Sequence, residues 1–156
     1  MNALVIYDSV FGNTETIAQV IAAALGTQAI PVSQAEAGRL CGLDLLVVGS
    51  PTRGFRPTEG MAKLLHGLPK NHLTGVRVAA FDTRIALETI NSRALRFLVD
   101  KGGYAASTLA KTLEKKGGVV TAPPEGFFVT GEQGPLKEGE GERAAAWAGG
   151  LGTRSE

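Results

Sequence analysis

The sequence has little cysteine, no excess of either charge and no long apolar run. Cys41 is the one cysteine among 156 residues, which excludes a disulfide framework within the chain and a metal site built from several cysteines. Sixteen basic residues balance fifteen acidic ones, so no charge excess indicates a surface for nucleic acid or membrane. The apolar runs are about as long as strands, far below the roughly 20 residues of a membrane span. These absences predict a cytoplasmic protein in a reducing compartment that binds neither nucleic acid nor membrane.

Length and composition favour one globular domain over residues 1–156. A chain of this length buries about two-thirds of the surface that its unfolded form exposes. Apolar residues make up 44%, charged residues 20%, and the 21 glycines fall singly or in pairs at expected turns, which is typical of a globular chain without low-complexity segments. We expect a monomer or a weak dimer.

Apolar periodicity alternates between strand and helix along the chain. Residues 3–7, ALVIY, and 43–50, LDLLVVGS, are nearly continuous apolar runs, which suit parallel strands covered on both faces. The stripe of Ile17, Ile21 and Ala24 predicts a helix over 13–25 that ends at a glycine. Other strands are predicted over 29–32 and 76–83, and a last strand over VVT and GFFV, interrupted by two prolines. Other helices are predicted over 61–68, 91–100, 103–116 and 144–151. The Glu-rich stretch 132–142 is expected to be a solvated helix start.

Strands that alternate with helices predict right-handed crossovers and a parallel sheet. The expected fold class is α/β, a three-layer α/β/α sandwich around a five-stranded parallel sheet. In such sheets ligands bind at the carboxyl ends of the strands. The candidate site is therefore expected in residues 8–14, 49–58, 82–91 and 130–136.

The turn after the first strand, SVFGNT at 9–14, has the residues of an anion site. Hydroxyl groups stand at both ends, a glycine lies between them, and a helix begins at its far side. Backbone N–H groups there can converge on an anion, and the helix dipole favours negative charge. A phosphate fits this turn; the alternative is that Ser9, Asn13 or Thr14 only caps the helix.

The loop after the third strand, SPTRGFRPT at 50–58, carries an aromatic ring between two arginines. Turn formers dominate this loop, and a merely connecting loop has little use for an exposed aromatic side chain. A planar ligand could stack on Phe55. The alternative is that Phe55 packs into the core and that Arg53 and Arg56 are solvated.

Three segments together, VIYDSVFGNTETIA, DLLVVGSPTRGFRPT and GFFVTGEQGPLKEGE, resemble the flavodoxin family over nearly the whole chain. The lack of a long insertion in the last strand resembles the short-chain form. The resemblance implies the strand order 2-1-3-4-5, noncovalent binding of FMN and electron transfer with redox partner proteins. It implies a phosphate loop of Ser9, Val10, Phe11, Gly12, Asn13 and Thr14, a first flavin-flanking loop of Ser50, Pro51, Thr52, Arg53, Gly54 and Phe55, and a second of Asp82, Thr83 and Arg84.

Two features depart from that family. Its members usually present a tyrosine or another aromatic residue on the second flanking loop, where FDTRIALETI has none beyond the phenylalanine of the strand. Electron-shuttle flavodoxins are also strongly acidic, whereas this chain is near neutral. Arg53, Arg56 and Arg84 are expected close to the flavin ring, where positive charge would favour the anionic reduced flavin.

The sequence lacks the residues that other proteins of similar fold use to bind or process their ligands. A response-regulator receiver needs clustered carboxylates after the first strand, where Asp8 stands alone. A Rossmann dinucleotide site and a Walker A loop need several glycines, and only Gly12 is present in the first turn. A cysteine phosphatase needs its nucleophile in an anion-binding loop, whereas Cys41 precedes the third strand and is predicted to be a small buried side chain. His66 and His72 are expected to be structural or surface residues.

Three functions stay open at this point. The first is an FMN-binding electron carrier, which we favour over an enzyme with its own substrate. The second is an FMN-dependent oxidoreductase acting on a quinone or a similar small acceptor. The third is a flavodoxin-like module that has lost FMN and serves as a binding or regulatory domain.

Overall fold

A computed structural model describes residues 1–53, 56–85 and 104–152. The helix predicted over 91–100 lies outside these residues. The strands are β1 Ala3–Tyr7, β2 Ala29–Pro31, β3 Leu45–Pro51, β4 Arg77–Ile85, β5 Val119–Val120 and β6 Glu125–Val129. The helices are α1 Asn13–Leu25, α2 Glu59–His66, α4 Ala105–Lys115 and α5 Glu140–Gly152, with two short 3₁₀ helices at Val32–Gln34 and Ala37–Arg39.

One parallel sheet organises the chain in the order β2-β1-β3-β4-β5. Strand β6 also pairs with β4, next to its carboxyl half, while β5 pairs with its amino half. The two segments are therefore the two parts of the last strand, interrupted near Pro123 and Pro124 as the sequence predicts. The predicted strand order and the three-layer α/β/α architecture are confirmed.

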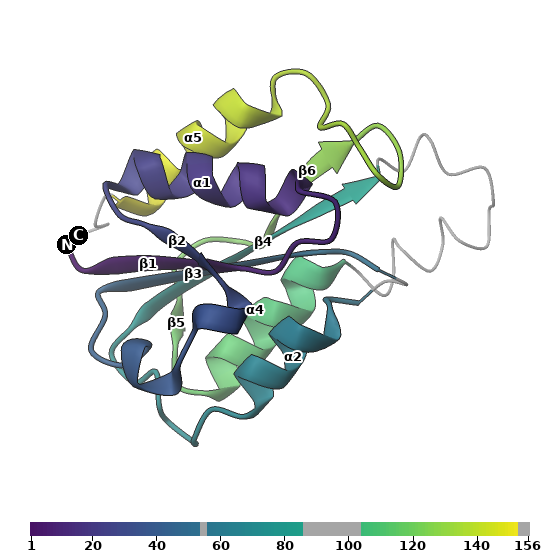
Figure 1. The fold of residues 1–156 in the computed structure, drawn as a ribbon. Coiled ribbons are helices and arrows are strands. Elements are labelled where there is room, and N and C mark those ends of the chain that lie inside the picture. The colour runs from purple at the N-terminus through teal and green to yellow at the C-terminus, as the bar shows by residue number, and fades with distance from the viewer. Residues whose placement is uncertain (54–55, 86–103, 153–156) are drawn as a thin grey trace.

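Helices cover both faces of the sheet (Figure 1). Helices α1 and α5 lie on one face, and α2 and α4 on the other. Because side chains alternate along a strand, Val5 of β1 packs under α1 while Ile6 packs toward the opposite side. Both faces of β1 and β3 are buried, which explains why their sequences are runs of apolar residues without polar alternation.

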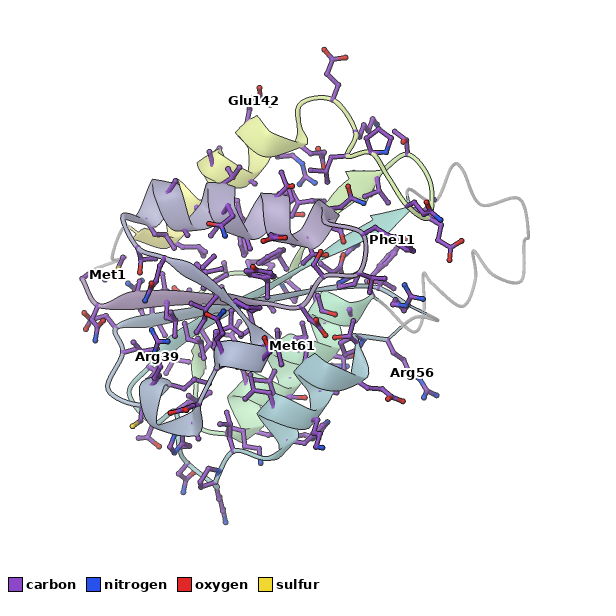
Figure 2. The ribbon with its side chains drawn as sticks, in the orientation of Figure 1. Met1, Phe11, Arg39, Arg56, Met61 and Glu142 are labelled. Atoms are coloured by element: carbon purple, nitrogen blue, oxygen red, sulfur yellow. The ribbon has the colours of Figure 1, made fainter. Side chains whose placement is uncertain are left out.

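The predicted helical stripes face the sheet. Ile17 and Ile21 of α1 are fully buried, and burial of each stabilises the fold by about 1.5–3 kcal/mol. Met61 of α2 is likewise buried, while Glu142 extends from α5 into solvent (Figure 2). Helix α1 ends at Gly26, whose left-handed φ of 69° allows its N–H to bond back to the last turn.

The prediction for Cys41 is wrong, and the prediction for the Glu-rich stretch 132–142 is wrong at Glu140. Cys41 is exposed rather than buried, because it follows the short helix Ala37–Arg39 on a surface turn, where its thiol donates to the carbonyl of Gly38. The Glu-rich stretch is not wholly solvated. Glu140 is buried because its carboxylate accepts from the N–H of Phe128 at 2.7 Å and pairs with Arg143.

None of the helices within the described ranges has the length and apolarity needed to cross a bilayer. The carboxyl ends of β1, β3, β4 and β6 lie together at one edge of the sheet, beside the amino terminus of α1 (Figure 1). Every segment in which the sequence predicts a ligand begins at this edge.

Candidate functional site

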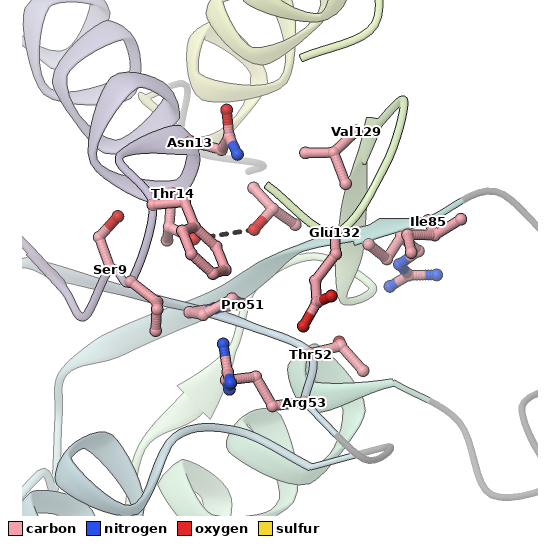
Figure 3. Close-up of a pocket in the computed structure, with 13 residues that line it drawn as sticks. Ser9, Asn13, Thr14, Pro51, Thr52, Arg53, Ile85, Val129 and Glu132 are labelled. Atoms are coloured by element: carbon pink, nitrogen blue, oxygen red, sulfur yellow. Dashed lines mark hydrogen bonds between the residues drawn. The ribbon is translucent and has the colours of Figure 1, made fainter. Parts of the chain in front are cut away.

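A cavity of about 280 Å³ opens at the carboxyl edge of the sheet (Figure 3). Its lining comes from four places in the chain: the turn after β1, the end of β3, the end of β4, and β6 with the loop that follows it. The lining residues are Ser9, Val10, Phe11, Asn13, Thr14, Pro51, Thr52, Arg53, Thr83, Arg84, Ile85, Val129 and Glu132.

The turn after β1 gathers backbone N–H groups around one oxygen atom. The Oγ of Ser9 accepts from the N–H of Gly12 at 3.0 Å and from that of Glu15 at 3.4 Å. Gly12 makes this turn possible with a φ of 94°, a conformation that costs other residues about 1 kcal/mol or more. Ser9 therefore caps the start of the helix, which is the alternative that the sequence left open. The turn also shows how its N–H groups can surround an oxygen atom.

Further N–H groups of the same turn are not used by the described residues. Those of Val10, Phe11, Asn13 and Thr14 have no acceptor within the described part of the chain. Asn13 and Thr14 begin α1, a helix of 13 residues, so its dipole adds positive potential at the same place. Unpaired donors and a helix terminus together make a site that attracts an anion.

Thr14 joins this turn to β4. Its hydroxyl and that of Thr83 lie 2.8 Å apart, and both side chains are buried (Figure 3). Alternation along β4 turns Thr83 toward α1 and turns its neighbours Asp82 and Arg84 toward α4. The turn after β1 is thereby fixed relative to the far wall of the cavity.

Asn13 joins the turn to the loop after β6. Its amide nitrogen donates to the carbonyl of Gln133 at 3.1 Å. The backbone of Gly134 also approaches the Asn13 amide so closely that a side chain at Gly134 would overlap it. The loop after β6 is therefore held over the amino terminus of α1.

The end of β3 supplies the floor of the cavity. The N–H of Thr52 donates to the carbonyl of Thr83 at 3.0 Å, which continues the β3–β4 pairing by one residue. Arg53 and Arg56 exchange backbone hydrogen bonds of 2.7 and 3.0 Å, and the Arg53 guanidinium lies 5.9 Å from the ring centre of Phe11. Arg53 lines the cavity, whereas Arg56 is exposed outside it. The predicted residues Gly54 and Phe55 lie outside the described residues.

The second flanking segment differs from its predicted form. Asp82, Thr83 and Arg84 belong to strand β4, which continues to Ile85, and not to a loop. The strand continues because β6 pairs with its carboxyl half. Thr83 and Arg84 line the cavity. Asp82 is fully buried behind it and pairs with Arg84 through two hydrogen bonds of 2.6 and 2.9 Å.

The surroundings of Asp82 act on its pKa in opposite directions. Burial raises the pKa, while hydrogen bonds from Arg84, the N–H of Ala106 and the hydroxyl of Thr52 lower it, and the net direction is upward. The carboxylate also binds the amino terminus of α4, since Ala106 is in the first turn of that helix. Asp82 thus supports the cavity wall from behind without forming part of its surface.

Three lining residues were not named from the sequence. Ile85 and Val129 make an apolar wall where β4 and β6 run side by side, and the carboxylate of Glu132 projects into the space near Pro51 and Thr52 (Figure 3). Their segments were expected at this edge, but no local pattern singles out one glutamate among the several of residues 132–142. Tyr104 was also missed; its ring centre lies 3.5 Å from the Arg84 guanidinium.

Comparisons with known proteins give structures but no sequence relatives. No protein-family model matches the chain, and neither does any curated protein sequence. The oxidised flavodoxin 1 of Bacillus cereus superposes with a TM-score of 0.73 over 97% of both chains at 18% identity. A flavodoxin from the domain Archaea gives 0.72 over 97% of this chain and 96% of that one, at 20% identity.

The same fold occurs within longer proteins. The rubredoxin oxygen:oxidoreductase of Desulfovibrio gigas matches with a TM-score of 0.69 at 18% identity, over 96% of this chain but only 35% of that chain. At such low sequence identity, the superpositions show only that the sheet and helices are arranged alike. The likeness covers nearly the full length of both the Bacillus and the archaeal protein. This chain therefore has the flavodoxin-like fold.

Proposed function

We propose that this protein binds FMN and transfers electrons with a redox partner protein. The observation that carries the proposal is the set of N–H groups at the start of α1 that have no acceptor among the described residues. They lie in the turn that lines the cavity at the carboxyl edge of the sheet. Anionic ligands of doubly wound folds bind at this kind of position. The flavodoxin-like fold supports the choice of FMN among phosphate-bearing ligands.

The donors of the turn suit a phosphate group. The N–H groups of Phe11, Asn13 and Thr14 can donate to its oxygens, and the hydroxyl of Ser9 is able to turn toward it. The Ser9 oxygen already collects two N–H groups, and a phosphate oxygen would be held in the same manner. Hydrogen bonds to a charged acceptor are stronger than those between neutral groups, so phosphate provides much of the binding energy.

The remainder of the cavity suits a planar ring. Pro51 and Thr52 form one side, and Ile85 and Val129 another. The cavity volume of about 280 Å³ is close to the lower end of the roughly 300–1,000 Å³ of small-ligand sites. FMN supplies the redox chemistry when bound, and the chain's own residues bind it, orient it and keep water from its apolar edge.

An FMN-dependent oxidoreductase is the second candidate. Arg53 and Glu132 favour it, because a cation and a carboxylate in one cavity can orient a small acceptor such as a quinone and exchange a proton with it. The two candidates use the same flavin site. They differ in whether the reduced protein passes electrons to a protein or to a small molecule.

Titration of the apoprotein with FMN and with riboflavin tests the proposal. We expect FMN to bind at least tenfold more tightly than riboflavin, which has the same ring but no phosphate. A protein that retains no flavin after incubation with excess FMN and removal of the unbound FMN overturns both flavin functions and leaves the binding module. Rapid oxidation of NAD(P)H by a quinone, with no added reductase, would favour the oxidoreductase over the carrier.

A further inference from the structure

Arg84 is held more firmly than an arginine on a cavity wall usually is. Its Nε and Nη2 atoms donate to the two carboxylate oxygens of Asp82 at 2.6 and 2.9 Å. The guanidinium also lies on the ring of Tyr104, 3.5 Å from its centre. A planar guanidinium with a bidentate carboxylate and an aromatic ring has its position and its plane both fixed.

Gly126 provides the space for this arrangement. It lies on β6 directly opposite Asp82, and a Cβ at this position would overlap the Nε, Cζ and Nη2 atoms of Arg84. The guanidinium therefore crosses the sheet over a residue without a side chain. Any other residue at position 126 would have to displace Arg84.

Asp82 holds both Arg84 and the start of α4. The carboxylate is buried, and besides Arg84 it accepts from the N–H of Ala106 at 2.9 Å. A buried ion pair is often no more stabilising than an apolar pair of similar size, because both charges lose their hydration. A gain in stability therefore does not explain the ion pair of Asp82 with Arg84. The fixed position that it gives to Arg84 does explain it.

The described residues leave part of the Arg84 guanidinium without a partner. A guanidinium has five N–H donors, and two nitrogens are occupied by Asp82. Nη1 has no acceptor within the described residues and is not completely buried, since every completely buried side-chain nitrogen and oxygen described has a partner. The Arg84 side chain as a whole is 17% exposed. Arg84 also lines the cavity. Within the described part of the chain, Arg84 is therefore a fixed cation on the cavity wall with one nitrogen that no residue engages.

We propose that Arg84 is the group that receives the negative charge of the flavin ring and that Asp82 is its positioning residue. The inference rests on the proposed function. Full reduction of a flavin at neutral pH places a negative charge on the carbonyl-bearing part of its ring. A guanidinium held in place stabilises that charge without first having to reorganise.

The potential of the second one-electron reduction of bound FMN tests this role. Arg84→Gln should destabilise the anionic reduced flavin at least tenfold, which lowers this potential by about 59 mV. Arg84→Lys, which keeps the charge but not the bidentate geometry, should lose part of the effect, and Gly126→Ala should lower the potential because it displaces the guanidinium. Arg56→Gln removes an exposed cation outside the cavity and should change it little. Equal potentials in Arg84→Gln and the wild type overturn the proposal, as does an equal shift in Arg56→Gln.

The apoprotein tests the positioning separately from FMN. In ¹⁵N-resolved NMR, the Nε–H of Arg84 should exchange with water at least tenfold more slowly than that of Arg56, and Asp82→Asn should remove the difference. Exchange as fast as that of Arg56 in the wild type overturns the fixed guanidinium even if FMN binds. A protein that retains no FMN overturns the proposed function and the ligand named here, while this measurement still decides whether Asp82 positions Arg84.

Discussion

The two ends of the cavity are built in different ways. At the α1 end the donors are backbone N–H groups, held by a turn of six residues that are consecutive in the chain. At the β4 end the donor is a side chain, held by residues from β4, β6 and the start of α4. The first end depends on the conformation of one segment, and the second on the packing of several.

This difference determines what each end can tolerate. A backbone donor is unaffected by most substitutions provided that the turn keeps its shape, so only changes at special positions such as Gly12 should damage it. The guanidinium of Arg84 can be displaced by the loss of Asp82 or Tyr104, or by a side chain at Gly126. We therefore expect few sensitive positions at the α1 end and several at the β4 end.

The largest expected effect is at Gly12. Gly12→Asp places a carboxylate beside the proposed phosphate site and should weaken FMN binding at least 100-fold, or about 2.7 kcal/mol, with a smaller effect on riboflavin. Gly12→Asn is the matched control, because asparagine has nearly the same size and the same left-handed backbone strain but no charge. Fluorescence titration of both variants measures the difference. Similar losses in both variants would show that the backbone, not the charge, decides binding.

The sequence predicts the α1 end far better than the β4 end. SVFGNT lies between a strand and a helix, so its cluster of N–H groups at the helix start follows from six neighbouring residues. The parallel sheet follows from apolar runs that need both faces covered. The fixed position of Arg84 depends on the register of β4 with β6, which brings Gly126 next to Arg84, 42 positions away in the chain. No local pattern relates Gly126 to Arg84, or identifies Glu132 as the glutamate in the cavity.

Cys41 and Glu140 were mispredicted for a similar reason. A free cysteine is among the residue types most often buried, but Cys41 follows the short helix Ala37–Arg39 on the surface and is exposed. A glutamate at a helix start is usually solvated. Burial of Glu140 depends on Arg143 and on the N–H of Phe128, so it follows from how α5 packs on β6 and not from the residue's neighbours in sequence.

A double-mutant cycle at Thr14 and Thr83 tests whether the two ends are coupled. Each single change to valine leaves one buried hydroxyl without its partner, and should lower the free energy of unfolding by about 1–3 kcal/mol. The double variant should lose less than the sum of the two, because no hydroxyl is then left unpaired. Urea unfolding of the four proteins gives the coupling energy. Additive losses would mean that the two walls are held independently.

Glu140→Gln tests the support of the β4 end, because Glu140 fixes β6 through Phe128. Arg143 and the N–H of Phe128 hold the pKa of Glu140 below its ordinary value against the opposing effect of burial. The unfolded protein therefore binds the proton at higher pH than the folded one, and the stabilisation is present above the ordinary pKa and is lost as pH falls through the lowered one. We expect Glu140→Gln to lose about 1–2 kcal/mol at pH 7 and less in acid.

The exposed Glu142 of the same helix provides the control for this measurement. Glu142→Gln removes a charge of the same sign from the first turn of α5 without touching β6, so it should change the free energy of unfolding by less than about 0.5 kcal/mol. Urea unfolding at several pH values compares the two variants with the wild type. A loss in Glu140→Gln that does not change with pH would mean that packing, not the charge of Glu140, holds β6.

The smallest expected effect is at Glu132, whose carboxylate projects into the cavity. A negative charge there repels an anionic ligand, but the side chain is exposed and solvent screens the repulsion. Glu132→Gln should therefore tighten FMN binding less than about fivefold, and added salt should reduce the gain. Glu138→Gln, an exposed glutamate outside the cavity lining, should leave affinity unchanged. Weaker binding in Glu132→Gln would instead make this carboxylate a hydrogen-bond acceptor for the ligand.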